Sequence, residues 1–303
     1  MHPFFPSEAW TSHSALGVAN GCRCDNTHAT AARPMTSSLS LEKIMGFFPE
    51  DRPLYVDTFI ILSLANYILA RFVLSYTSLY GKTTRKGTSQ TIYISYQYMS
   101  LFSTTYCSYL GWYGWLYDRG TVDQDHLYGK SETAQRLGHV MTGYQFWNLL
   151  LCAFIKEYRT GAFLGHHITT AILSYSIPRP FVNYHALFFI GIAETSNFPL
   201  SLMDIMKGLE LEPVYPKLAA VVRYTFALSF YVLRVFIWPY ASYMFWIDAL
   251  ENFDHIHSKP ILILFLVGNT GLSLLQFYWG YLIGRRALGL TKPKPRSQKK
   301  KGQ

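Results

Sequence analysis

The chain has 303 residues, half of them hydrophobic and only 15% charged, whereas ordinary soluble domains are about 25% charged. This deficit excludes a typical soluble protein and predicts one all-α, polytopic membrane domain with two short tails. The net charge of +9 lies largely in the C-terminal tail. A basic tail directly after an apolar span is typical of a cytosolic end beside anionic lipid, so no nucleic-acid partner is expected.

Residues 1–52 are rich in Ser, Thr, Ala, His and Pro and lack the basic and apolar regions of a signal peptide. We expect a disordered N-terminal tail. Within it, Cys22 and Cys24 form a CRC sequence without the second pair that a zinc site needs. Cys107 and Cys152 fall in apolar stretches and are expected to be buried as small hydrophobic residues.

Membrane-spanning helices need about 20 mainly apolar residues. The stretch 91–117 is the most polar candidate and is expected to face protein or a cavity more than lipid. The stretch 162–177 is short and ends at Pro178 and Pro180, because proline lacks a backbone N–H and disfavours helix before it. About seven transmembrane helices are predicted, at 56–80, 91–117, 136–156, 162–177, 181–206, 217–246 and 260–284.

The loops differ in charge on the two sides of these spans, with Lys and Arg concentrated on one side and Asp and Glu on the other. Because basic loops favour the cytosol, we expect a lumenal N-terminus and a cytosolic C-terminus. The basic tail, 291–303, ends in KKGQ, which resembles a dilysine signal for retrieval to the endoplasmic reticulum. The predicted location is therefore the endoplasmic reticulum membrane.

Two adjacent histidines, His166 and His167, stand near the cytosolic end of the fourth predicted span. Adjacent residues on a helix point about 100° apart, so the two rings cannot aim at one point through the same face. His167 shares a face with Thr170 and Ser174. A histidine here is a candidate general base or nucleophile. The alternative is a pair that only holds helices together by hydrogen bonds.

Glu194 lies in the middle of the fifth predicted span and is followed by Asn197 and Pro199. A carboxyl at that depth is expected to be protonated or paired, and Arg234 in the sixth span is the expected partner. Asn148, in the third span, is as compatible with hydrogen bonding between helices as with a binding site. The same holds for one face of the last span, which carries Asn269, Ser273 and Gln276.

A metal site is not expected at the paired histidines. Membrane di-iron oxygenases carry repeated histidine boxes, whereas His139 and His185 stand alone in this sequence and His255 and His257 form only an HxH. We therefore predict no metal ion for this chain.

Four segments in this order, GYQFWNLLL, HHITTAILSYS, AETSNFPLSLMDIMK and FALSFYVLRVFIWPY, together resemble the TLC domain (TRAM–LAG–CLN). The resemblance covers roughly residues 86–290, after a first transmembrane helix at 56–80. It implies a bundle of membrane helices around a central lipid-facing cavity, in proteins that act on or sense lipids, mostly in the endoplasmic reticulum.

Ceramide synthases, the best-known members, transfer an acyl chain from acyl-CoA to a sphingoid base with paired histidines and two aspartates. By this resemblance, His166 and His167 match the histidines, and Glu194 and Asn197 fall where the aspartates would be. The chain departs from the pattern there, and Asn148 replaces a further frequent aspartate. An amide cannot accept a proton as a base, so the sequence is closer to the general TLC-domain-containing proteins.

Two functions stay open at this point. The first is lipid homeostasis, in which the chain binds or senses a membrane lipid or acyl chain. The alternative is an acyl-CoA-dependent N-acyltransferase, in which Glu194 orients a reactive histidine and acyl-CoA is a co-substrate. No other cofactor is expected. The predicted catalytic residues are His166, His167 and Glu194, and the predicted lipid-binding residues are Asn148, Thr170, Ser174, Asn197 and Arg234.

Overall fold

The computed structural model describes residues 53–179, 181–256 and 258–288. The expected N-terminal tail and basic C-terminal tail lie outside these residues. Within them the chain is all-helical, apart from an isolated bridge between Thr83 and Ser89. The predicted all-α class is therefore confirmed for the described part of the chain.

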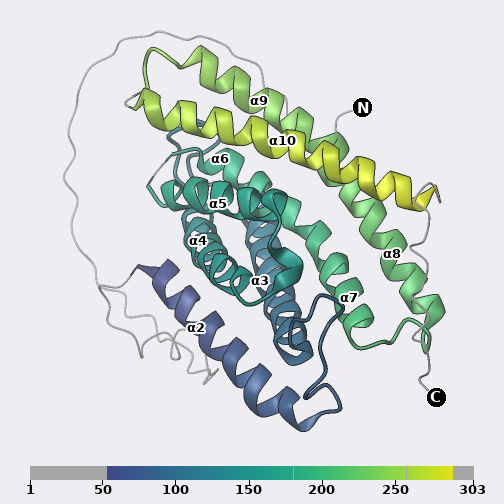
Figure 1. Cartoon of the computed structure of the whole chain (residues 1–303). Coiled ribbons are helices and arrows are strands. Elements are labelled where there is room, and N and C mark those ends of the chain that lie inside the picture. The colour runs from purple at the N-terminus through teal and green to yellow at the C-terminus, as the bar shows by residue number, and fades with distance from the viewer. Residues whose placement is uncertain (1–52, 180, 257, 289–303) are drawn as a thin grey trace, which may run out of the picture. The chain divides into compact units, whose positions relative to one another are not determined.

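Helical segments occupy each of the predicted apolar stretches (Figure 1). Four are simple: α2 (Leu54–Ile68), which continues through two short turns to Tyr76, α3 (Gln90–Leu116), α4 (Glu132–Cys152) and α5 (Gly161–Ser176). Two are composite, each made of several consecutive helical segments. The first consists of α6 (Asn183–Ala186), η4 (Leu187–Gly191), η5 (Ile192–Ser196) and α7 (Asn197–Gly208). The second consists of α8 (Pro216–Phe230), η6 (Tyr231–Ile237) and α9 (Trp238–Glu251). The last is α10 (Lys259–Ala287), beside α9 in Figure 1.

Among the described residues, four helical stretches are long and apolar enough to cross a membrane: Leu54–Tyr76, Asn183–Gly208, Pro216–Glu251 and Lys259–Ala287. The helix α5 has 16 residues, which is short for a bilayer core about 30 Å thick. The helices α3 and α4 bury many polar side chains. The number of seven spans therefore stays a prediction.

The helix α3 packs its polar residues against protein, as its composition predicted. Ser95, Gln97, Ser100, Ser103 and Thr104 are buried, on a helix that contacts α4, α7, η4 and η5. The hydroxyls of the last two donate to carbonyls one turn back in their own helix. These two hydrogen bonds satisfy hydroxyls that would be costly to leave unpaired in contact with lipid.

Two prolines interrupt the composite helices next to the polar residues. Pro199 and Pro239 cannot donate a backbone hydrogen bond to the carbonyl four residues earlier. The chain before Pro199 winds into the π-helical turn η4 and the 3₁₀ turn η5, and the chain before Pro239 forms the π-helical turn η6. Glu194 and Arg234 lie in these irregular turns. A change in the number of residues per turn changes the direction in which the following side chains point.

The helix α3 approaches the composite helix α6–α7 closely at a pair of glycines. A Cβ on Gly111 would lie 2.5 Å from the backbone of Gly191, which is far inside van der Waals contact. The absence of both side chains lets the two backbones touch. This contact fixes where η5 and its Glu194 stand in the bundle.

Candidate functional site

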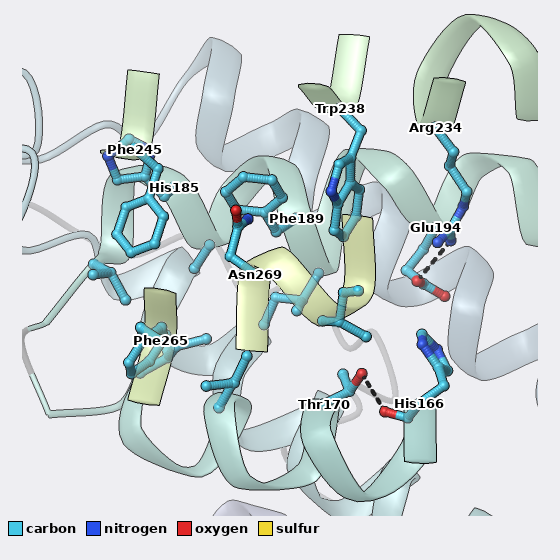
Figure 2. Close-up of a pocket in the computed structure, with 16 residues that line it drawn as sticks. His166, Thr170, His185, Phe189, Glu194, Arg234, Trp238, Phe245, Phe265 and Asn269 are labelled. Atoms are coloured by element: carbon cyan, nitrogen blue, oxygen red, sulfur yellow. Dashed lines mark hydrogen bonds and ion pairs between the residues drawn. The ribbon is translucent and has the colours of Figure 1, made fainter. Parts of the chain in front are cut away.

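A pocket lies between α5, the α6–α7 rod, the α8–α9 rod and α10 (Figure 2). Ten of its sixteen lining residues are hydrophobic: Leu173, Ile177, Val182, Ala186, Phe189, Ile190, Trp238, Phe245, Phe265 and Leu272. The polar lining residues are His166, Thr170, His185, Glu194, Arg234 and Asn269. Figure 2 shows His166, Glu194 and Arg234 together at one end and His185 with Phe245 at the other. The pocket is therefore mainly apolar along its length and has polar side chains at both ends.

Glu194 and Arg234 form a buried ion pair at the first end. Arg234 Nη2 lies 3.0 Å from Glu194 Oε1, and Arg234 Nε donates to Ser196 Oγ at 2.7 Å. Asn197 Nδ2 donates to the second carboxylate oxygen of Glu194 at 2.6 Å. Glu194 is 7% exposed and Arg234 3% exposed. Both carboxylate oxygens are thus satisfied, which is the condition under which buried charges are tolerated.

His166 faces this ion pair across the pocket (Figure 2). Its ring packs edge-on against Trp279, with 5.3 Å between ring centroids. Its Nδ1 atom is buried and has no hydrogen-bond partner among the described residues. Thr170 also lines the pocket, and its hydroxyl donates to the His166 carbonyl at 2.9 Å. His166 therefore has a ring nitrogen that a bound molecule can engage.

His167 is placed differently from its neighbour. It does not line the pocket; its Nδ1 atom is hydrogen-bonded to Gln145 Oε1 on α4. The ring packs against Phe163, with centroids 4.1 Å apart. This divergence follows from the 100° step between adjacent helical residues. In this structure His167 joins α5 to α4, while His166 faces the pocket.

Three further predicted site residues, Asn148, Ser174 and Asn197, also lie outside the pocket. Asn148 is fully buried on α4, and its Oδ1 accepts a hydrogen bond from the Tyr96 hydroxyl at 2.6 Å. Ser174 is fully buried and accepts a hydrogen bond from Thr142 Oγ1 at 3.0 Å. Both side chains connect neighbouring helices here. Asn197 reaches the site only through Glu194.

Several pocket residues carry no chemical signal in the sequence. Trp238, Phe189, Phe245 and Phe265 are ordinary apolar residues, and only the packing of separate helices brings them to one passage. Asn269 is a partial exception, because an amide in an apolar span is a visible signal. Its Nδ2 donates to Ser242 Oγ at 3.1 Å, while its Oδ1 has no partner among the described residues.

The cavity volume is about 50 Å³, whereas pockets for small molecules are commonly about 300–1,000 Å³. The space holds a short stretch of hydrocarbon or a small polar group in the conformation described. Any larger ligand requires the helices around the pocket to separate, and α5 and α10 are two of them. These helices meet where a Cβ on Gly268 would lie 2.8 Å from Leu173 Cδ1.

These features describe an integral membrane helical protein with a polar-ended, mainly apolar pocket. The sequence profile of the TLC domain matches residues 93–285, well over half of the chain. The chain therefore belongs to the TLC-domain family, whose members are generally membrane proteins of lipid metabolism. The matched region contains all the pocket-lining residues. A search of curated proteins finds no match.

Proposed function

We propose that the chain binds a membrane lipid, or the acyl chain of one, in this pocket and acts in lipid homeostasis at the endoplasmic reticulum membrane. The observation that carries the proposal is the convergence of His166, Glu194 and Arg234 at one end of an apolar passage inside the helical bundle. A polar lipid group would lie at that end, with hydrocarbon along Phe189 and Trp238. The cytosolic orientation of the C-terminus, supported by the loop charges, is part of this proposal.

Recognition would come mainly from the polar end. Lipid tails are about as apolar as the lining, so moving a chain from the bilayer into the pocket gains little hydrophobic free energy. By contrast, a buried polar group without a partner costs roughly 1–3 kcal/mol. His166 Nδ1 and Asn269 Oδ1 are such groups. A ligand that hydrogen-bonds to them recovers this cost, which favours a lipid with donors and acceptors near one end.

Lipid retention by purified protein tests the proposal. The variant Ala186→Leu adds a larger side chain to the pocket lining, and Ala171→Leu adds the same bulk outside it; both alanines are 3% exposed. We expect native mass spectrometry to show bound lipid on the wild type and on Ala171→Leu, and at least about tenfold less on Ala186→Leu. Equal lipid retention by both folded variants would sink the pocket as the binding site.

A second candidate function is N-acyl transfer from acyl-CoA. The observation that favours it is the Nδ1 atom of His166, which has no partner among the described residues, on a side chain that lines the pocket together with Glu194. In this reaction His166 would take the proton of an acceptor amine as it attacks the thioester carbonyl, and coenzyme A thiol would leave. Alternatively, the imidazole nitrogen would attack the thioester first and carry the acyl group.

Release of free coenzyme A separates the two functions. The purified protein is given acyl-CoA and a panel of long-chain amines. Under the enzyme hypothesis, His166→Ala abolishes thiol release, while His167→Ala, checked for retained fold, keeps a measurable rate because His167 does not line the pocket. No release with any acceptor, alongside retained lipid, would leave binding as the function and refute acyl transfer.

A further inference from the structure

A second polar cluster lies at the end of the pocket opposite His166. His126 Nδ1 and His185 Nε2 both lie 2.9 Å from the same carboxylate oxygen, Asp248 Oδ2. The three ligand atoms lie within 4.8 Å of one another. They come from the α3–α4 loop, from α6 and from the end of α9, so they are widely separated in the sequence. Two imidazoles and a carboxylate that are far apart in the sequence therefore lie next to one another only in the folded chain.

The surrounding loop holds His126 firmly in place. Asp125 Oδ1 accepts from the backbone N–H groups of Leu127 and Tyr128 at 2.9 and 2.8 Å. Val182 N donates to the Leu127 carbonyl at 2.6 Å, which ties the loop to the turn before α6. The His126 ring also stacks on Tyr184, with 4.0 Å between ring centroids. The imidazole is therefore ordered by its neighbours rather than by Asp248 alone.

The three ligand atoms lie close enough together to bind one metal ion after a small rearrangement. Zinc bonds of about 2.0–2.2 Å at tetrahedral angles separate ligand atoms by roughly 3.3 Å. The observed nitrogen-to-oxygen distances of 2.9 Å need to lengthen by about 0.4 Å to reach this value, and the two histidine nitrogens, which lie within 4.8 Å of each other, need to approach by up to about 1.5 Å. Both histidines already aim one ring nitrogen at the carboxylate. We propose that His126, His185 and Asp248 bind a divalent transition metal ion, with Zn²⁺ the best match for this ligand set.

The ligand types and the accessibility both support this assignment. Imidazole nitrogens favour zinc and its neighbours over Mg²⁺ and Ca²⁺, which prefer oxygen ligands. Three protein ligands leave one tetrahedral position open. The His126 side chain is 33% exposed and gives access from the loop side, while His185 lines the pocket. An ion here would therefore stand at the boundary between the pocket and the loop surface. The site does not depend on the proposed lipid binding.

The test is metal binding by the full-length purified protein after removal of metal with a chelator. Co²⁺ is the probe, because its visible absorption reports tetrahedral coordination by nitrogen and oxygen. All variants carry Cys22→Ser and Cys24→Ser, so that thiolates of the N-terminal tail do not contribute. We expect this background protein to bind Co²⁺ with tetrahedral absorption and Zn²⁺ to displace it.

Three ligand variants and one control locate the site. His126→Gln, His185→Gln and Asp248→Asn should each weaken Co²⁺ binding at least about 100-fold, since even outer-sphere partners of metal ligands change affinity 10–100-fold. His139→Gln removes a histidine outside the cluster and should leave binding unchanged. Circular dichroism checks that each variant folds; His126→Gln, on a loop, is the least disruptive. Absence of tetrahedral absorption in the background protein, or its persistence in His126→Gln, would overturn the metal site.

Discussion

The ion pair between Glu194 and Arg234 gives the sharpest energetic prediction. Glu194→Gln keeps the shape of the side chain and removes its charge, leaving a guanidinium that is 3% exposed without a counter-ion. Breaking a buried ion pair from one side costs about 3–5 kcal/mol. A neutral hydrogen bond between membrane helices contributes only about 0.6 kcal/mol on average. The two magnitudes differ enough for one stability measurement to distinguish them.

The assay is reversible unfolding in mixed micelles, followed by helicity, for a double-mutant cycle. The variants are Glu194→Gln, Arg234→Met and the double variant. We expect each single variant to lose about 3–5 kcal/mol, and the double variant to lose no more than either one, because it leaves no unpaired charge. Additive losses, or single losses near 0.6 kcal/mol, would refute the claim that a desolvated ion pair holds this end of the pocket.

Two other predictions concern positions away from the pocket. Gly111→Ala should lower the free energy of unfolding by about 1–3 kcal/mol, because its Cβ would meet the Gly191 backbone at 2.5 Å; Gly271→Ala, in open space, is the matched control. At the α4–α5 loop, burial opposes ionisation of Glu157, yet hydrogen bonds from Thr84 and Thr88 hold its pKa below the ordinary 4.5. This lowered pKa stabilises the fold above about pH 4.5, and the stabilisation is lost as pH falls through the folded-state pKa.

The controls for these predictions are direct. If Gly111→Ala unfolds at the same denaturant concentration as Gly271→Ala, the close approach of the two helices is wrong. For the loop carboxyl, thermal unfolding of the wild type and Glu157→Gln is compared at about pH 7 and about pH 3. The wild type should lose more stability on acidification than the variant, and equal losses would contradict the role assigned to Glu157.

The sequence is sufficient to predict where the helices lie and that Glu194 pairs with Arg234. Long apolar stretches predict helices because the bilayer demands internal backbone hydrogen bonding, and the observed segments occupy those stretches. The pairing of Glu194 with Arg234 could be expected because neither charge is tolerated alone at that depth. The different placement of His166 and His167 follows from helix geometry. Each of these inferences depends on the length, polarity or geometry of single helices and does not require knowledge of how the helices pack.

Other features could not be read from the sequence because they depend on how the helices pack. Ser174 shares a helix face with His167, and Asn148 is compatible in the sequence with either a binding site or a contact between helices; both hydrogen-bond to side chains of other helices outside the pocket. His185 appears isolated in the sequence, but the fold places it 2.9 Å from Asp248. The winding of η4, η5 and η6 decides which side chains face the pocket, and a proline signals only that the helix is disturbed.

Photolabelling in a bilayer tests the central claim most directly. The wild type is reconstituted with a lipid whose acyl chain carries a photoreactive group, and labelled residues are identified by mass spectrometry. We predict labels on pocket residues such as Phe189 and Trp238 that disappear in Ala186→Leu. Labels on the exposed Leu64 and Phe72, in the first helical stretch Leu54–Tyr76, should persist as an internal control. Labels confined to such outward-facing residues in the wild type would contradict lipid binding in the pocket.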